Sequence, residues 1–143
     1  MERHEFERAV KGVAEEMLSR DGELMPAIYA VPHGAPPGEV AVIQVPTADE
    51  AQKEMLAEAI CELRAAMVLF AFVSEAWASE QDEMAPEDDP EREEVVLANF
   101  YHGLEASSEM ASILRHGSGA TLGPWTEIEG LAGRFHRGVP SFN

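Results

Sequence analysis

Three side chains in the second half of the sequence have types that could transfer protons. Glu75 and Trp77 lie at the end of one apolar run, and His102 lies at the end of another. A carboxylate beside an imidazole is the minimum of a general acid–base pair, which requires that the two runs form neighbouring strands. One hypothesis is therefore a pocket near Glu75, Trp77 and His102. The alternative, which we favour, is structural: Trp77 packs on a helix, and Glu75 pairs with Arg115 on the surface of a sheet.

Other patterns of catalytic residues are missing from the sequence. It has no nucleophile elbow, phosphate-binding glycine loop, dinucleotide fingerprint or metalloprotease motif. Cys61 is the single cysteine, so it cannot form an internal disulfide, and Glu54 and Glu58 on the same helical side should suppress its thiolate. We expect an inert cysteine and assign no catalytic residue; the sequence leans against an enzyme and leaves that question open.

Patterns that bind metals are equally weak. The five histidines are dispersed and form none of the close pairs that zinc sites use; they are His4, His33, His102, His116 and His136. A run of carboxylates could supply the oxygen ligands of calcium, but this run has no glycine and contains Pro86 and Pro90. We expect no metal and no other cofactor.

The acidic run from Glu80 to Glu94 is the most unusual segment of the chain. It holds nine carboxylates against one base, Arg92, in a chain with a formal charge of −17. Prolines punctuate it and apolar stretches flank it, which indicates a long solvated loop inside a folded domain rather than an acidic tail. The Lys and Arg residues number only ten and are scattered. This charge balance argues against nucleic acid or an anionic membrane as a direct ligand.

We expect one α+β domain over residues 1–143, with two helices packed on one face of a mainly antiparallel sheet of about five strands, in the order α-β-β-α-β-β-β. In the first helix, Phe6, Val10, Val13 and Met17 should form the buried stripe, and Gly22 should end it. The expected strands are Ala27 to Pro32, Glu39 to Val45, Met67 to Val73 continuing to Trp77, Val95 to Tyr101, Met110 to Leu114, and Thr121 to Glu127 with a break at Gly123-Pro124. Residues 130–143 should be irregular.

The second helix should begin at Thr47, with Glu50 completing a capping box. Its buried stripe should comprise Met55, Leu56, Ala59, Ile60, Leu63 and Met67. Glutamates recur on this helix at a spacing of four, and they could join the acidic loop in one negative patch. The candidate interaction surface consists of Glu50, Glu54, Glu58, Glu62, Glu80, Asp82, Glu83, Glu87, Asp88 and Asp89.

Residues 73–77 (VSEAW) followed by Pro86, Pro90, Arg92 and Glu94 form a recognisable pattern. It resembles a pattern in small, functionally uncharacterised bacterial proteins, in which VSEAW is followed by P-x-x-x-P-x-R-x-E. The resemblance covers about 25 of the 143 residues. It implies a strand, a polar connection and a following strand, and it implies no chemistry.

These observations favour a non-enzymatic cytoplasmic protein that binds other proteins through its acidic surface. The first residues lack the apolar stretch of a signal peptide, and the run from Ala65 to Val73 is too short to cross a bilayer. The expected partner is a basic protein surface, or a second copy in a homo-oligomer. One alternative is a small enzyme or ligand-binding protein with the pocket near Glu75, Trp77 and His102. Another is a phage- or defence-related mimic of nucleic acid.

Overall fold

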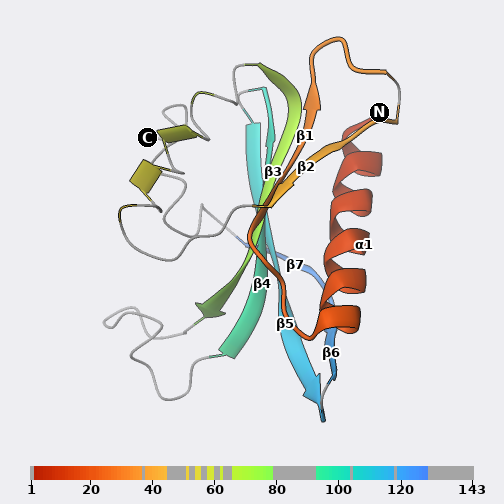
Figure 1. Cartoon of the computed structure of the whole chain (residues 1–143), viewed down its shortest axis with the longest axis vertical. Helices are drawn as coiled ribbons and strands as arrows, with labels where there is room; N and C mark the ends of the chain where they lie inside the picture. The colour runs from red at the N-terminus through yellow and green to blue at the C-terminus, as the bar shows by residue number, and fades with distance from the viewer. Residues whose placement is uncertain are drawn as a thin grey trace.

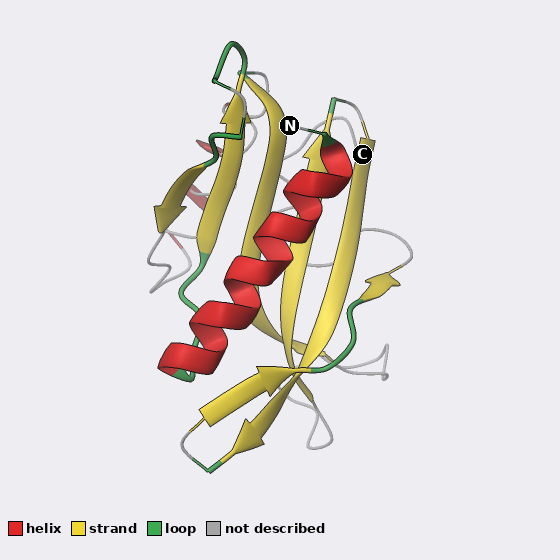
Figure 2. Cartoon of the chain, turned by 90° about the vertical axis from the view of Figure 1, so that its right-hand side faces the viewer, coloured by secondary structure: helices red, strands yellow, loops and turns green. Residues whose placement is uncertain are grey.

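The structure, a computed structural model, describes residues 2–36, 38–44, 51, 54–55, 58–59, 62, 66–78, 93–103, 105–117 and 119–128. Its elements are α1 (Arg3–Asp21), β1 (Ala27–Pro32), β2 (Ala41–Gln44), β3 (Met67–Ala78), β4 (Glu93–His102), β5 (Glu105–His116), β6 (Gly119–Leu122) and β7 (Thr126–Ile128). Helix α1 crosses one face of a curled antiparallel sheet that forms a half-barrel (Figures 1 and 2). The expected α+β fold class is confirmed.

The sheet has the strand order β2-β1-β3-β4-β5-β6, and β7 also pairs with β5. The expected number of about five strands is too small, partly because the last expected strand is two strands. The N–H of Gly123 donates to the carbonyl of Ser112 at 2.9 Å, and the chain then passes through Pro124, which has no N–H. β6 and β7 consequently pair with different parts of β5.

Helix α1 buries a stripe that differs from the expected one. Phe6 and Val10 are buried as expected, but Ala14 and Leu18 complete the stripe. Val13 is exposed, which corrects its assignment to the core, and Met17 is only partly buried. Ala14 is fully buried, and its small side chain allows the helix to approach the sheet closely.

Gly22 ends α1 as expected. Its φ of 74° is left-handed, and its N–H donates to the carbonyl of Leu18 at 2.8 Å. Glycine adopts this conformation without the steric cost that a Cβ atom brings.

Both faces of the sheet are buried at β3, which confirms the expected central strand. Leu69, Ala71 and Val73 face the core beneath α1. Phe70 and Phe72 belong to a second buried cluster on the other face, where the Phe70 and Tyr101 rings lie 5.7 Å apart at 53°. A strand covered on both faces must be apolar throughout, as this one is.

The expectation of two helices packed on one face of the sheet is wrong. Among the described residues, α1 is the helix that covers that face. The described pieces of the segment 51–62 have helical backbone and lie on the other side of the sheet from α1 (Figure 1). Met55, expected in the buried stripe, is 69% exposed. Met67, expected both in that stripe and as the first residue of a strand, opens β3. Thr47, Glu50, Leu56, Ile60 and Leu63 lie outside the described residues.

The connection that the acidic run forms between two strands is shorter than expected. Glu93 and Glu94 belong to β4, where Glu93 lies opposite Ala78 of β3. Residues 79–92 therefore connect two neighbouring antiparallel strands; like residues 129–143, they lie outside the described part. Among the described residues, no helix has the length and apolar character needed to cross a bilayer.

Candidate functional site

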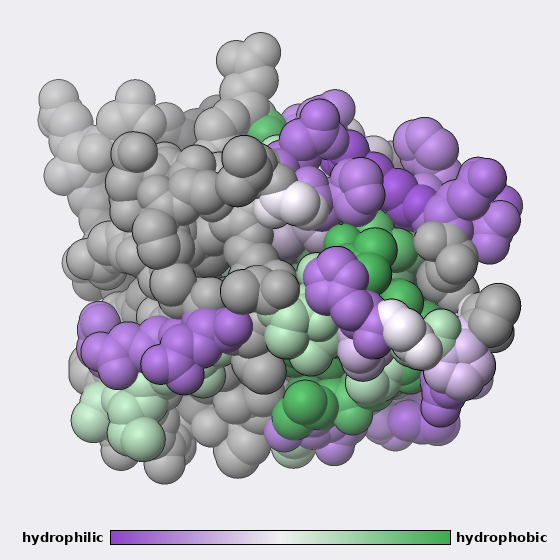
Figure 3. Space-filling view, turned by 90° about the horizontal axis from the view of Figure 1, so that it is seen from above, coloured by the Kyte–Doolittle hydropathy of each residue, from purple (hydrophilic) through white to green (hydrophobic). Residues whose placement is uncertain are grey.

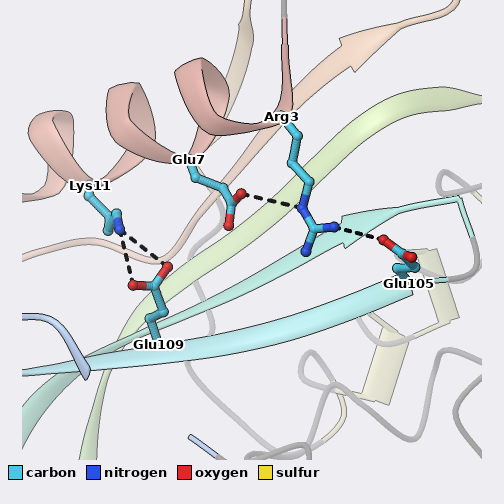
Figure 4. A network of polar contacts seen from close by, with 5 residues as sticks. All are labelled: Arg3, Glu7, Lys11, Glu105 and Glu109. Carbon is cyan, nitrogen blue, oxygen red and sulfur yellow. Dashed lines mark hydrogen bonds and ion pairs between the residues drawn. The ribbon is translucent and has the colours of Figure 1, made fainter. Parts of the chain in front are cut away.

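One side of α1 carries a polar stripe at a spacing of four residues: Arg3, Glu7, Lys11 and Glu15. Residues four apart lie one above another on a helix, so these side chains face the same neighbours. The guanidinium of Arg3 lies 3.3 Å from the carboxylate of Glu7 and 2.7 Å from that of Glu105 on β5 (Figure 4). The stripe therefore begins with an ion pair to the sheet.

The rest of the stripe continues this attachment. The ammonium of Lys11 donates to both carboxylate oxygens of Glu109, at 3.0 and 3.2 Å (Figure 4). Farther along, the indole N–H of Trp125 donates to the carboxylate of Glu15 at 3.0 Å. These ion pairs are partly exposed, so each is worth on the order of 1 kcal/mol or less. Together they fix the rotation of α1 on the sheet.

A groove of about 450 Å³ lies between α1 and strands β5 and β7. Alternate residues of a strand share a face, which places Ser107 and Glu109 of β5 toward the helix. Glu127 of β7 is directly opposite Glu109. The groove is lined by Arg3, His4, Glu7, Arg8, Lys11, Ser107, Glu109 and Glu127.

Charges in this groove nearly balance. Among the described residues, His4, Arg8 and Glu127 form no ion pair, while Arg3 and Lys11 are held by carboxylates. No group of three potential metal ligands occurs in the part of the chain that the structure describes. The groove has neither a hydrogen-bonded carboxylate–imidazole pair nor a metal-ligand set there, and its ion pairs serve to position the helix.

A second polar cluster surrounds Arg115 on β5. Its guanidinium donates to both carboxylate oxygens of Glu94 at 3.1 Å and lies 3.6 Å from Glu75. It also donates to the carbonyl of Gly22, while the N–H of Leu24 donates to Glu75 at 2.8 Å. Hydrogen bonding to Arg115 lowers the pKa of Glu94. The structural alternative for Glu75, pairing with Arg115, is confirmed.

The register of β3 and β4 separates the expected acid–base residues. Val96 lies opposite Glu75, whereas His102 lies opposite Leu69 at the far end of β4. Six residues of strand separate Val96 from His102, which corresponds to about 20 Å. The backbone of Trp77 lies opposite Glu94, and its side chain is outside the described residues. The structure therefore does not bring His102 to Glu75.

Three members of the expected interaction surface are described: Glu54, Glu58 and Glu62. All three are exposed, and none forms an ion pair with another described residue. The others lie outside the described residues: Glu50, Glu80, Asp82, Glu83, Glu87, Asp88 and Asp89. Cys61 and His136 also lie outside them.

Three polar side chains are buried in the sheet. Ser108 and Asn99 lie opposite each other on β5 and β4, and the hydroxyl of Ser108 donates to the side-chain oxygen of Asn99 at 2.7 Å. On the α1 side, the hydroxyl of Tyr29 is buried without a hydrogen-bond partner among the described residues. Burial raises the pKa of Tyr29.

A smaller hollow of about 320 Å³ lies under the loop between β1 and β2. Its lining includes Pro32, Ala35, Val40 and Ala41. Seen from this end of the molecule, hydrophobic groups gather in a patch with hydrophilic residues beside it (Figure 3). The hollow thus lies next to the first residue of β2.

Sequence analysis missed the polar stripe, although a signal for it exists. Opposite charges recur at a spacing of four in Arg3, Glu7 and Lys11, and the carboxylates Glu105 and Glu109 are also four residues apart. Each pattern indicates a polar face of its own element. The two faces meet through contacts between residues about one hundred positions apart, such as Arg3–Glu105 and Lys11–Glu109. The pattern within each element does not predict such contacts.

Comparison of the chain with family models, curated proteins and solved structures gives no match. Its function is therefore inferred from its own residues.

Proposed function

We propose that this protein is a non-enzymatic interaction module that binds a basic protein surface through its acidic residues. The observation that carries the proposal is the exposure of Glu54, Glu58 and Glu62 without a neutralising partner among the described residues. Like charges at a spacing of four destabilise a helix by a few tenths of a kcal/mol for each pair, roughly 0.2–0.5. A complementary basic partner would remove this repulsion.

The polar stripe of α1 provides an internal comparison. There Arg3 pairs with Glu105, and Lys11 pairs with Glu109. Carboxylates of that region are used to hold the fold together. The column of Glu54, Glu58 and Glu62 has no such use in the described residues, which supports a role toward a partner.

The alternative of an acid–base pocket has less support. His102 and Glu75 lie about 20 Å apart along the sheet by their strand positions, and Glu75 already binds Arg115 and the backbone of Leu24. The resemblance to small bacterial proteins adds no chemistry to either proposal.

The test compares two variants of equal charge. The first replaces Glu54, Glu58 and Glu62 with glutamine, and the matched control replaces three exposed glutamates near α1 with glutamine: Glu5, Glu16 and Glu23. Each variant, and the original protein, is immobilised and exposed to a soluble extract of the source organism at low and high salt.

We expect the original protein and the control to retain a basic protein at low salt and to release it at high salt, because screening weakens exposed charge pairs. The variant of Glu54, Glu58 and Glu62 should retain much less of it. Equal loss in both variants, or retention that salt does not weaken, would contradict the proposal. Competition by duplex DNA for the same partner would instead favour the nucleic-acid mimic.

A further inference from the structure

We infer that the groove between α1 and strands β5 and β7 binds a small zwitterion, a molecule with one carboxylate and one ammonium group, such as a free amino acid. Arg8 on α1 binds its carboxylate, and Glu127 on β7 binds its ammonium group. The inference goes beyond the proposed acidic surface and is independent of it, because it depends on residues that form no part of that surface.

Arg8 and Glu127 are charged side chains on opposite walls of this groove. Arg8 belongs to α1 and Glu127 to β7, and both line the groove and are exposed. Among the described residues, neither has an ion-pair partner, whereas the neighbouring Arg3 and Lys11 are held by carboxylates (Figure 4). The groove therefore keeps one unmatched cation on its helix wall and one unmatched anion on its sheet wall.

The sheet wall has one carboxylate more than the ammonium of Lys11 can neutralise. Glu127 lies directly opposite Glu109 on the neighbouring strand, and both line the groove. Like charges directly opposite each other on paired strands are destabilising. Lys11 donates to both carboxylate oxygens of Glu109, at 3.0 and 3.2 Å, so its ammonium is committed to that residue. An ammonium group from a ligand beside Glu127 removes the remaining repulsion.

The helix wall has the opposite imbalance. Arg8 follows His4 by four residues and precedes Lys11 by three, so the three side chains are neighbours on α1. Lys11 is held by Glu109, whereas Arg8 offers the pair of parallel N–H donors with which a guanidinium binds a carboxylate. The imidazole of His4 and the hydroxyl of Ser107 supply further hydrogen-bonding groups in the same groove. A ligand carboxylate therefore finds its partner at Arg8.

Charge favours a ligand that carries both signs. With histidine counted as neutral, three basic and three acidic side chains line the groove, so their charges cancel. A simple anion would approach a chain of formal charge −17 and lie near Glu127, whereas a simple cation would lie near Arg8. A zwitterion has no net charge and places each of its charged groups beside a group of opposite sign.

The size of the groove also suits a small molecule. Its volume of about 450 Å³ is near the lower end of the range of ligand pockets, which is roughly 300–1,000 Å³. Its walls are a helix and a sheet that ion pairs already hold together, so the charged groups are in place before a ligand binds.

The test is calorimetric titration of the original protein with zwitterions of increasing length: glycine, β-alanine, γ-aminobutyrate and ε-aminocaproate. Butyrate and butylamine are the probes that carry a single charge. We expect at least one zwitterion to bind with a dissociation constant about tenfold or more below that of either single-charge probe, because those probes make only one of the two contacts.

Four variants locate the site. Arg8→Gln and Glu127→Gln should each raise the dissociation constant of that zwitterion at least about tenfold, since each removes a charged hydrogen-bonding group. The matched controls are Arg20→Gln and Glu16→Gln, which remove the same charges from exposed positions of α1 outside the groove, and they should bind like the original protein. Circular dichroism should show that all four variants remain folded.

Three results would overturn the inference. They are the failure of every zwitterion to bind more tightly than the single-charge probes, binding that Arg8→Gln and Glu127→Gln leave unchanged, and equal weakening by the control variants. The glutamine variant of Glu54, Glu58 and Glu62 should bind the zwitterion unchanged, so this inference and the proposed function can fail separately.

Discussion

Replacing Tyr29 with phenylalanine should stabilise this protein. The Tyr29 side chain is 1% exposed, and its hydroxyl has no hydrogen-bond partner among the described residues. Mutations in other proteins show that a buried hydroxyl without a hydrogen-bond partner lowers the free energy of unfolding by about 1–3 kcal/mol. Tyr29→Phe keeps the ring and removes this cost, so the free energy of unfolding should rise by up to about that amount.

The assay is urea unfolding of the original protein and of two variants. Tyr29→Leu is the matched control: it also removes the hydroxyl, but it leaves a cavity where the ring was. Loss of ring volume should destabilise it relative to Tyr29→Phe by about 1–3 kcal/mol. If Tyr29→Phe instead lowers the free energy of unfolding, the hydroxyl has a partner and the reasoning is refuted.

The same substitution has a pH signature. Burial raises the pKa of Tyr29 above its ordinary value of 10.0, so the native state holds its proton more tightly than the unfolded state does. Stability from this difference is fully present below pH 10 and is lost as pH rises toward the native pKa, with a slope of at most about 1.4 kcal/mol per pH unit. Tyr29→Phe should show a smaller loss of stability between pH 9 and 11.

Two further predictions concern buried polar groups and glycine. Ser108→Ala should destabilise the protein by about 1–3 kcal/mol, because the buried oxygen of Asn99 loses the hydroxyl that donates to it at 2.7 Å. In denaturant unfolding, the double variant Ser108→Ala with Asn99→Leu should be destabilised by less than the sum of the two single variants. Gly22→Ala should lower the melting temperature by the equivalent of about 1 kcal/mol, since φ at Gly22 is 74°. Gly12→Ala is its control inside α1, where an added Cβ meets nothing within 4 Å, and should raise the melting temperature.

The elements that the sequence predicts well are those defined by local chemistry. β1 runs from Ala27 to Pro32 as expected, because an apolar β-prone run ends there at proline. The end of α1 follows from the left-handed preference of Gly22. The apolar continuity from Met67 to Val73 predicts a strand covered on both faces without knowledge of what covers it.

What the sequence could not predict depends on how the elements meet. The phase of α1 depends on the sheet beneath it, so Ala14 is buried and Val13 is not, although valine is the more apolar residue. The separation of Glu75 from His102 depends on the register of two long strands, which the residues alone leave open. The groove beside α1 depends on both the phase of α1 and the register of the strands. Composition alone therefore led us to predict an interaction surface at the acidic run and not at this groove.

Helix α1 is made before the strands described here, yet its polar contacts reach β5 and the segment between β6 and β7. Lys11 binds Glu109, 98 positions later, and Glu15 binds Trp125, 110 positions later. A ribosome adds about 5–20 residues per second, so the helix emerges roughly 5–20 s before these partners exist. Ile113 and Ala120 belong to the core beneath α1 and are made in the same late part of the chain, so some of the apolar cover of α1 is also missing for seconds. A chaperone that covers this side of α1 during synthesis should accordingly raise the yield of folded protein.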